Sequence, residues 1–148
     1  MKNAGMTIVV KNIAKLVIGF ILVFGTYIAL TGHLAPGGGF SGAVIIAAAT
    51  VLTVLAFGGA FSRKLVTEGV CHVWDGIGAL AFLAVALAGY GMGAFFMNFV
   101  PVTPEMNFQF VSAGMIPLAN LAILFKVGAG ISGVMLALFA VHRVLPKE

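Results

Sequence analysis

Long apolar segments, separated by short groups of polar residues, make up the pattern of this chain. No Asp, Glu, Lys or Arg occurs between Lys15 and Arg63, a run too long for one membrane-spanning helix of roughly 20 residues. Residues 31–39 interrupt this run with Pro36 and several glycines, which favour a turn. A further uncharged run lies between Asp75 and Glu105. The pattern predicts membrane-spanning helices near residues 13–31, 40–61, 73–99 and 115–141.

The segments between these helices are short. Residues 100–112, with Pro101, Pro104 and Glu105, are predicted to form a loop that holds a short surface helix around 106–110, and Pro117 is tolerable in the first turn of the last helix. The basic start resembles a signal peptide, but its apolar stretch is longer than such peptides carry and no convincing cleavage site follows. We therefore expect one four-helix transmembrane domain over residues 1–148.

Composition supports a membrane protein and excludes several other classes. Apolar residues make up 61% of the chain and charged residues 8%, whereas soluble domains carry about 25% charged residues. The single cysteine, Cys71, cannot form an internal disulfide or a thiolate metal site. The net charge of +4 comes from basic residues spread along the chain, which form no patch for nucleic acid.

The positions of the basic residues predict the orientation of the helices. Cytoplasmic loops of membrane proteins are enriched in Lys and Arg, and with four crossings the two termini and the second loop share one side. That side holds Lys2, Lys11, Lys15, Arg63, Lys64, Arg143 and Lys147, while the first and third loops hold no basic residue. We expect a multi-pass protein of the cell membrane with both termini cytoplasmic.

Lys126 is the basic residue that belongs to neither side. It falls some 13–14 Å into the last predicted helix, counted at about 1.5 Å per residue, near the middle of the membrane. A charged lysine there costs at least a few kcal/mol, so it should face protein or water. Since no acid is predicted at the same depth, we expect its partner to be a polar neutral group, water or another polypeptide. A hydration or proton-path role competes with a structural contact to a neighbouring subunit.

Other polar side chains are candidates for the same path. Asn120 and Ser132 lie on the same helix as Lys126. Glu68, His72 and Asp75 share one face if the third helix starts early enough, and they could collect protons or cations at the cytoplasmic entrance, or be simply hydrated. A haem between helix-end histidines is disfavoured, and we predict no cofactor, no metal site and no catalytic residue set.

The turn 32–42 reads Gly-His-Leu-Ala-Pro-Gly-Gly-Gly-Phe-Ser-Gly. It lacks the Gly-Lys-Ser/Thr ending of a phosphate-binding loop, so close packing is its favoured role, carried by His33, Pro36, Gly37, Gly38, Gly39 and Phe40. This segment resembles the signature of the B subunit of Mrp (also called Mnh) multisubunit sodium/proton antiporters. The similarity extends over the whole chain through its size, four helices and glycine-rich last helix. The resemblance implies a small accessory membrane subunit, with the principal proton-translocating chains elsewhere.

The last helix departs from this family pattern at one position. Where antiporter B subunits tend to read Phe-Asp-x-Gly-Val, this chain has Phe125 followed by Lys126, a base in place of an acid. This helix looks more like the B-type subunits of archaeal-type respiratory complexes, in which an Mrp-like module joins a membrane-bound hydrogenase or a sulfur-reducing complex.

The resemblance therefore implies a non-catalytic subunit that helps couple redox energy to the translocation of sodium ions and protons. The expected partners are other membrane subunits of an Mrp-like module, possible hydrogenase-type subunits and the lipid bilayer. A subunit of a free-standing Mrp antiporter, a self-sufficient small transporter and a purely structural scaffold stay open as alternatives.

Overall fold

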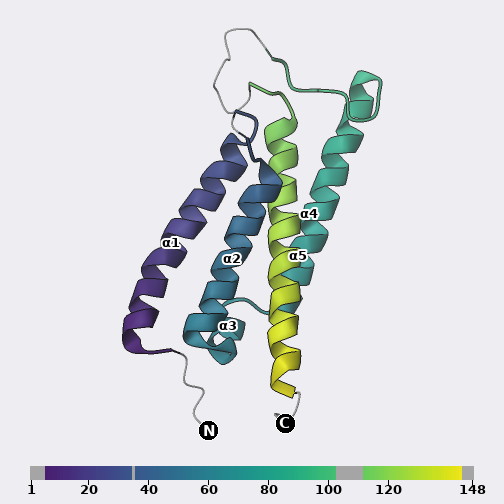
Figure 1. Ribbon diagram of the computed structural model, residues 1–148. Helices are drawn as coiled ribbons and strands as arrows, with labels where there is room; N and C mark the ends of the chain where they lie inside the picture. Colours follow the sequence, from purple (N-terminus) through teal and green to yellow (C-terminus); the bar gives the residue numbers. More distant parts are fainter. Residues whose placement is uncertain (1–5, 35, 103–111, 145–148) are drawn as a thin grey trace.

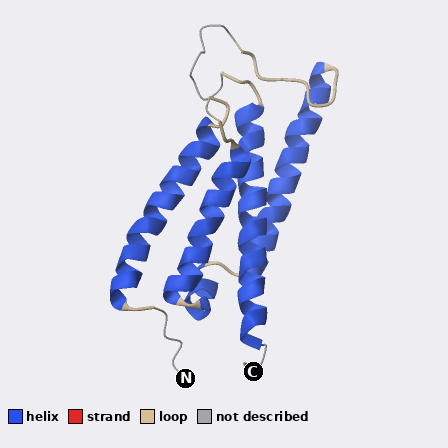
Figure 2. Ribbon diagram, viewed as in Figure 1, coloured by secondary structure: helices blue, strands red, loops and turns tan. Residues whose placement is uncertain are grey.

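The computed structural model describes residues 6–34, 36–102 and 112–144, and all regular structure in these ranges is helical (Figure 2). Four of the helices are long and apolar enough to cross a membrane, which confirms the predicted fold class. The elements are α1 (Ile8–Thr31), α2 (Gly39–Phe57), α3 (Gly59–Leu65), α4 (Glu68–Ala88), the 3-10 helix η1 (Gly89–Met92) and α5 (Ile116–Val144).

The four long helices stand side by side in the order α1, α2, α5, α4 and alternate in direction along the chain (Figure 1). α1 packs mainly on α2, α2 packs on α5, and α5 packs on α4. In the most apolar stretch of each span, a third of the residues of α2 and α5 are buried, against 17% for α1 and α4. The arrangement is thus an open row with α2 and α5 at its centre, and both broad faces of the row are left to other contacts.

Small residues bring neighbouring helices of the row close together. Gly25 of α1 lies against Gly42 of α2, and a Cβ added at Gly42 would come within 2.6 Å of the carbonyl oxygen of Gly25. Ala29 and Ala43 are buried beside this contact. In lipid, such close backbone packing replaces the hydrophobic driving force that holds soluble bundles together.

The second predicted helix is divided in two, contrary to the expectation of one helix over 40–61. α2 ends at Phe57, and Gly58 adopts φ +84°, a conformation that glycine takes readily and other residues rarely do. The short α3 then begins at Gly59. The predicted helix is too long because the apolar pattern continues through Phe61 and does not mark the break at Gly58.

The third helix is displaced relative to the predicted 73–99. It begins at Glu68, an acid in the first helical turn, where the helix dipole favours negative charge. It ends at Ala88, and after η1 the chain reverses at Gly93, whose φ is +111°. The first and last helices are each longer than predicted at one end, and the predicted surface helix around 106–110 lies outside the described residues.

Candidate functional site

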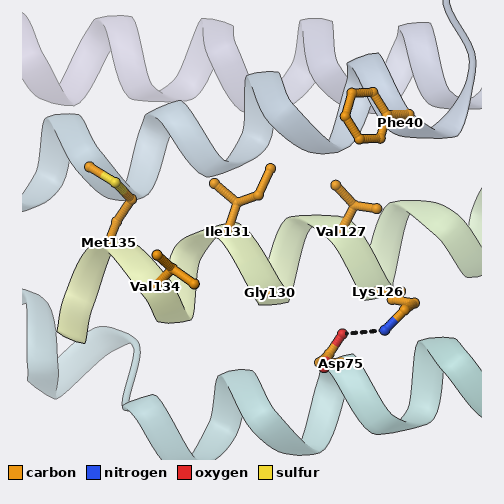
Figure 3. Close-up of a pocket in the computed structure, with 8 residues that line it drawn as sticks. All are labelled: Phe40, Asp75, Lys126, Val127, Gly130, Ile131, Val134 and Met135. Atoms are coloured by element: carbon orange, nitrogen blue, oxygen red, sulfur yellow. Dashed lines mark hydrogen bonds and ion pairs between the residues drawn. The ribbon is translucent and has the colours of Figure 1, made fainter. Parts of the chain in front are cut away.

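A salt bridge between Lys126 of α5 and Asp75 of α4 is the main polar contact within the described row. Lys126 Nζ donates a hydrogen bond to Asp75 Oδ1 at 2.9 Å. Figure 3 shows the lysine side chain directed away from α2 and toward the aspartate of the neighbouring helix. The expectation that Lys126 lacks an acidic partner within its own chain is therefore wrong.

The early start of α4 explains the error. Asp75 lies seven residues beyond Glu68, about 10 Å into the helix at 1.5 Å per residue, and not at its end. Lys126 lies ten residues beyond Ile116, about 15 Å from the opposite end of the row. The long lysine side chain spans the remaining difference in depth. Both residues thus lie inside helices that are long and apolar enough to cross a membrane.

Glycines on both helices allow the two charged residues to meet. Gly78 of α4 faces the backbone of Lys126, and a Cβ at Gly78 would approach the Lys126 amide nitrogen to 2.5 Å. On α5, Gly130 lies next to Asp75 Oδ1 and Gly133 next to the Cβ of Cys71. These positions remove side-chain bulk from the α4–α5 contact, so the ion pair forms between helices whose backbones nearly touch.

The ion pair is not enclosed by its own chain. The Lys126 side chain is 47% exposed and that of Asp75 is 38% exposed. A lysine ammonium has three hydrogen-bond donors, and among the described residues only Asp75 Oδ1 accepts from it. Next to the pair a groove of about 340 Å³ opens on the same face of the row. It is lined by Phe40, Asp75, Lys126, Val127, Gly130, Ile131, Val134 and Met135 (Figure 3).

Asn120 and Ser132 do not join this pair. Successive steps of six residues on a helix with 3.6 residues per turn place Asn120, Lys126 and Ser132 about 120° apart around α5. Ser132 is buried, and its hydroxyl lies 3.2 Å from that of Thr50 on α2. The structure therefore separates the three polar residues of α5 onto three sides of the helix.

The glycine turn packs the start of α2 against α5. Gly38 has φ +100°, and a Cβ at Gly32 would overlap Gly38, so the turn folds tightly onto itself. A Cβ at Gly39 would overlap the backbone of Asn120. Pro36 and Gly37 are exposed and His33 is half-buried. The packing role expected for this turn fits these contacts, and Phe40, which follows the turn, lines the groove beside Lys126.

Glu68 and His72 occupy the first turns of α4. Because the helix starts at Glu68, Glu68, His72 and Asp75 lie within about 60° of one another around it. Glu68 is half-buried and His72 is exposed. Of the three, Asp75 is bonded to Lys126. The helix face that carries these three residues therefore extends from the first turn of α4 to the ion pair.

The opposite face of the row has a second cavity, of about 490 Å³, which the hydropathy pattern does not predict. Its α5 residues, including Ser132, lie on the other side of that helix from those of the first groove. Trp74 and Phe125 stack there with ring centroids 5.2 Å apart. The signal available in the sequence is the set of three hydroxyl residues in α2, Ser41, Thr50 and Thr53, of which Thr50 lines this cavity. Within the described residues, no three His, Cys, Asp or Glu side chains come together as a metal site would need.

Comparisons with known proteins agree with this architecture. The family described as a domain related to the MnhB subunit of the Na+/H+ antiporter matches residues 9–133. A protein of Staphylococcus aureus strain Newman, named as antiporter subunit mnhB2, is 34% identical over 137 residues, which cover 88% of this chain and 93% of that one. An uncharacterized protein of Methanocaldococcus jannaschii is 33% identical over 135 residues, 85% of this chain and 50% of that one.

A solved structure extends the likeness to a larger assembly. A chain in the structure of the membrane-bound sulfane sulfur reductase, an archaeal respiratory membrane complex, superimposes with a TM-score of 0.74 at 30% identity and matches all of this chain. This chain spans half the length of the M. jannaschii relative and 62% of the reductase chain. Since the family match covers most of the sequence and the S. aureus relative is matched nearly end to end, the chain belongs to the family of MnhB-related Na+/H+ antiporter subunits.

Proposed function

We propose that this chain is a non-catalytic membrane subunit of an Mrp-type sodium/proton antiporter module attached to a redox-driven respiratory complex of the hydrogenase or sulfur-reductase class. Its relatives carry antiporter-subunit names, and one structural relative belongs to a respiratory complex. In this role the chain helps to couple redox energy to the movement of sodium ions and protons, while electron transfer belongs to other subunits.

The half-exposed ion pair of Lys126 and Asp75 carries the proposal. Its unused donors and acceptors face outward from the row at membrane depth, where exposure of charge to lipid is costly. Water and a neighbouring subunit satisfy these groups in the assembled complex. The pair then lies beside a hydrated path at a subunit interface.

The remaining candidates are assigned by their position in the row. Glu68 and His72 lie toward the end of α4 that the basic residues mark as cytoplasmic, so they form the mouth of the path. Asn120 packs against the glycine turn and Ser132 pairs with Thr50 of α2, and in the proposal each borders the path from its own side of α5. Both termini are on the cytoplasmic side.

Transport by the assembled complex tests the path. In vesicles that contain the complex, sodium-dependent pH changes are followed for Lys126→Ala and Asp75→Asn, and co-purification of the other subunits measures assembly. Loss of transport with normal assembly supports the path. Leu80→Ala is the matched control, because Leu80 is 68% exposed on the same helix as Asp75 and carries no polar group. Normal transport and assembly in both charge variants would overturn the proposed path.

The exchanged pair, Lys126→Asp with Asp75→Lys, separates charge pairing from transport. If the ion pair only holds α4 against α5, the exchange restores assembly and transport together. If the position of the lysine matters for the path, assembly recovers while transport stays low. If the single variants fail to assemble and the exchanged pair restores assembly, the result favours a structural scaffold. The close glycine contacts between the two helices also support that alternative.

A free-standing antiporter module is the second candidate. The observation that favours it is the match to the S. aureus antiporter subunit over 93% of that protein's length, against 62% for the reductase chain. Subunit analysis of the native complex distinguishes the two. Nickel-binding or iron–sulfur subunits that co-purify with this chain support the respiratory form, and large antiporter subunits alone support the free-standing form.

A further inference from the structure

The chain after α4 folds back on itself and forms an aromatic hairpin, residues 90–97. After the reversal at Gly93, the backbone N–H of Phe96 donates to the carbonyl of Ala86 at 3.1 Å. Gly89 makes room for this return, because a Cβ there would come within 2.5 Å of the Met97 amide nitrogen. The returning segment of the hairpin therefore lies beside the last turn of α4, near the end of the apolar span Glu68–Met92 (Figure 1).

The hairpin is built from large apolar side chains that its own chain leaves open. Tyr90, Met92 and Phe95 are each more than half exposed, and Phe96 and Met97 are partly so. The rings form a connected set, with centroid distances of 5.5 Å between Phe82 and Phe96, 5.5 Å between Phe95 and Phe96, and 5.8 Å between Tyr90 and Phe95. A surface of this kind is unfavourable in water.

Polar groups in this part of the chain are few, and the main one is occupied. The sequence has no charged residue and no histidine between Asp75 and Glu105. The Asn98 side chain bonds both backbone groups of Val100 and accepts from the N–H of Met115 at the start of α5. Asn98 thus fixes the hairpin to α5 and leaves its aromatic side chains as the outward surface.

We propose that the aromatic hairpin lies in the headgroup region of the bilayer and anchors this end of α4 to phospholipid. Tyrosine favours the boundary between lipid tails and water, because its ring prefers the apolar side while its hydroxyl reaches the polar side, and Tyr90 supplies this side chain while the neighbouring phenylalanines face the apolar side. The hairpin lies at the end of a span, which is where this boundary falls. Its lack of charge suits lipid, whereas a water-exposed loop would carry polar residues.

Tryptophan depth measurements test this placement, since Trp74 is the sole tryptophan of the chain. In a Trp74→Phe background, Phe95→Trp reports the hairpin and Leu80→Trp reports the middle of α4. Tyr90 lies ten residues beyond Leu80, about 15 Å along the helix axis. The full-length chain is placed in phosphatidylcholine vesicles whose lipids carry bromine either near the headgroup or near the tail end.

We expect the headgroup-side bromines to quench Phe95→Trp more strongly and the tail-end bromines to quench Leu80→Trp more strongly. Strong quenching of Phe95→Trp by aqueous acrylamide with none by either lipid would place the hairpin in water and overturn the proposal. Quenching by neither agent would mean that protein covers it, which also overturns the proposal. Tyr90→Trp in the same background repeats the measurement with a different ring, so misfolding of one variant does not decide the result.

Discussion

Replacing Gly78 by alanine should separate α4 from α5 and disturb the ion pair between them. The added Cβ would lie 2.5 Å from the amide nitrogen and 2.7 Å from the Cα of Lys126. Both are backbone atoms that cannot rotate away, so one helix must shift. Overpacking of this kind costs about 1–3 kcal/mol, while alanine in place of glycine gains up to about 1 kcal/mol of helix propensity.

Gly76→Ala is the matched control, because a Cβ at Gly76 meets nothing within 4 Å. It lies on the same helix two residues away and receives the same gain in propensity without the clash. The difference between the two variants therefore measures the contact alone, and we expect Gly78→Ala to be less stable than Gly76→Ala by about 1–3 kcal/mol.

Trp74 provides the assay. It stacks on Phe125 across the same pair of helices, so its fluorescence follows their separation when the purified full-length chain is unfolded in mixed micelles by increasing dodecyl sulfate. We expect Gly78→Ala to unfold at a lower dodecyl sulfate fraction than Gly76→Ala, with Trp74 emission already altered before unfolding. Identical unfolding curves for the two alanine variants would refute the argument that the α4–α5 distance is set at Gly78.

Three further substitutions test other contacts of the row. Ser132→Ala removes the hydrogen bond to Thr50 and should lower the free energy of unfolding by about 0.6 kcal/mol in the same titration, the usual size of such contacts in membranes; an unchanged midpoint would contradict it. Gly39→Ala places a Cβ on the backbone of Asn120 and should lower the thermal stability of the purified complex. Equal stability would show that the glycine turn shifts enough to accept the added methyl group. Asn98→Leu removes three hydrogen bonds and should speed protease cleavage between residues 98 and 115 in sealed vesicles; an unchanged cleavage rate would contradict the role of Asn98 in holding the hairpin to α5.

The four membrane spans could be predicted from sequence because hydropathy acts over whole helices and needs no knowledge of neighbours. The helix ends are predicted less accurately, because the limits of an uncharged run do not mark where a helix begins or ends. Glu68 shows the reason for the error: an acid is favourable in the first turn of a helix and does not end it. Gly58 shows the opposite case, since a single glycine in an apolar run ends α2 without any change in hydropathy.

The partner of Lys126 could not be found from sequence for a related reason. With the third helix starting at residue 73, Asp75 would lie about 3 Å from its end, whereas the observed start places it about 10 Å inside. Identifying this partner also requires the order of the helices in the row, because Asp75 faces Lys126 only where α4 packs on α5. The separation of Asn120 and Ser132 from the pair, by contrast, follows from their six-residue spacing on α5, and the packing adds only which neighbour each of them contacts.

The open row gives a physical reason why this chain should work together with other subunits. A closed bundle could surround an ion pair on all sides, but a row has two broad faces, and Lys126 and Asp75 lie at one of them with much of their side chains exposed. Lipid tails cannot accept or donate the hydrogen bonds that the pair leaves open. Water alone would need a cavity with a second wall, which the described part of this chain does not supply. In the proposed function, the surface of a neighbouring subunit supplies that wall, so the proposed hydrated path requires the assembled complex.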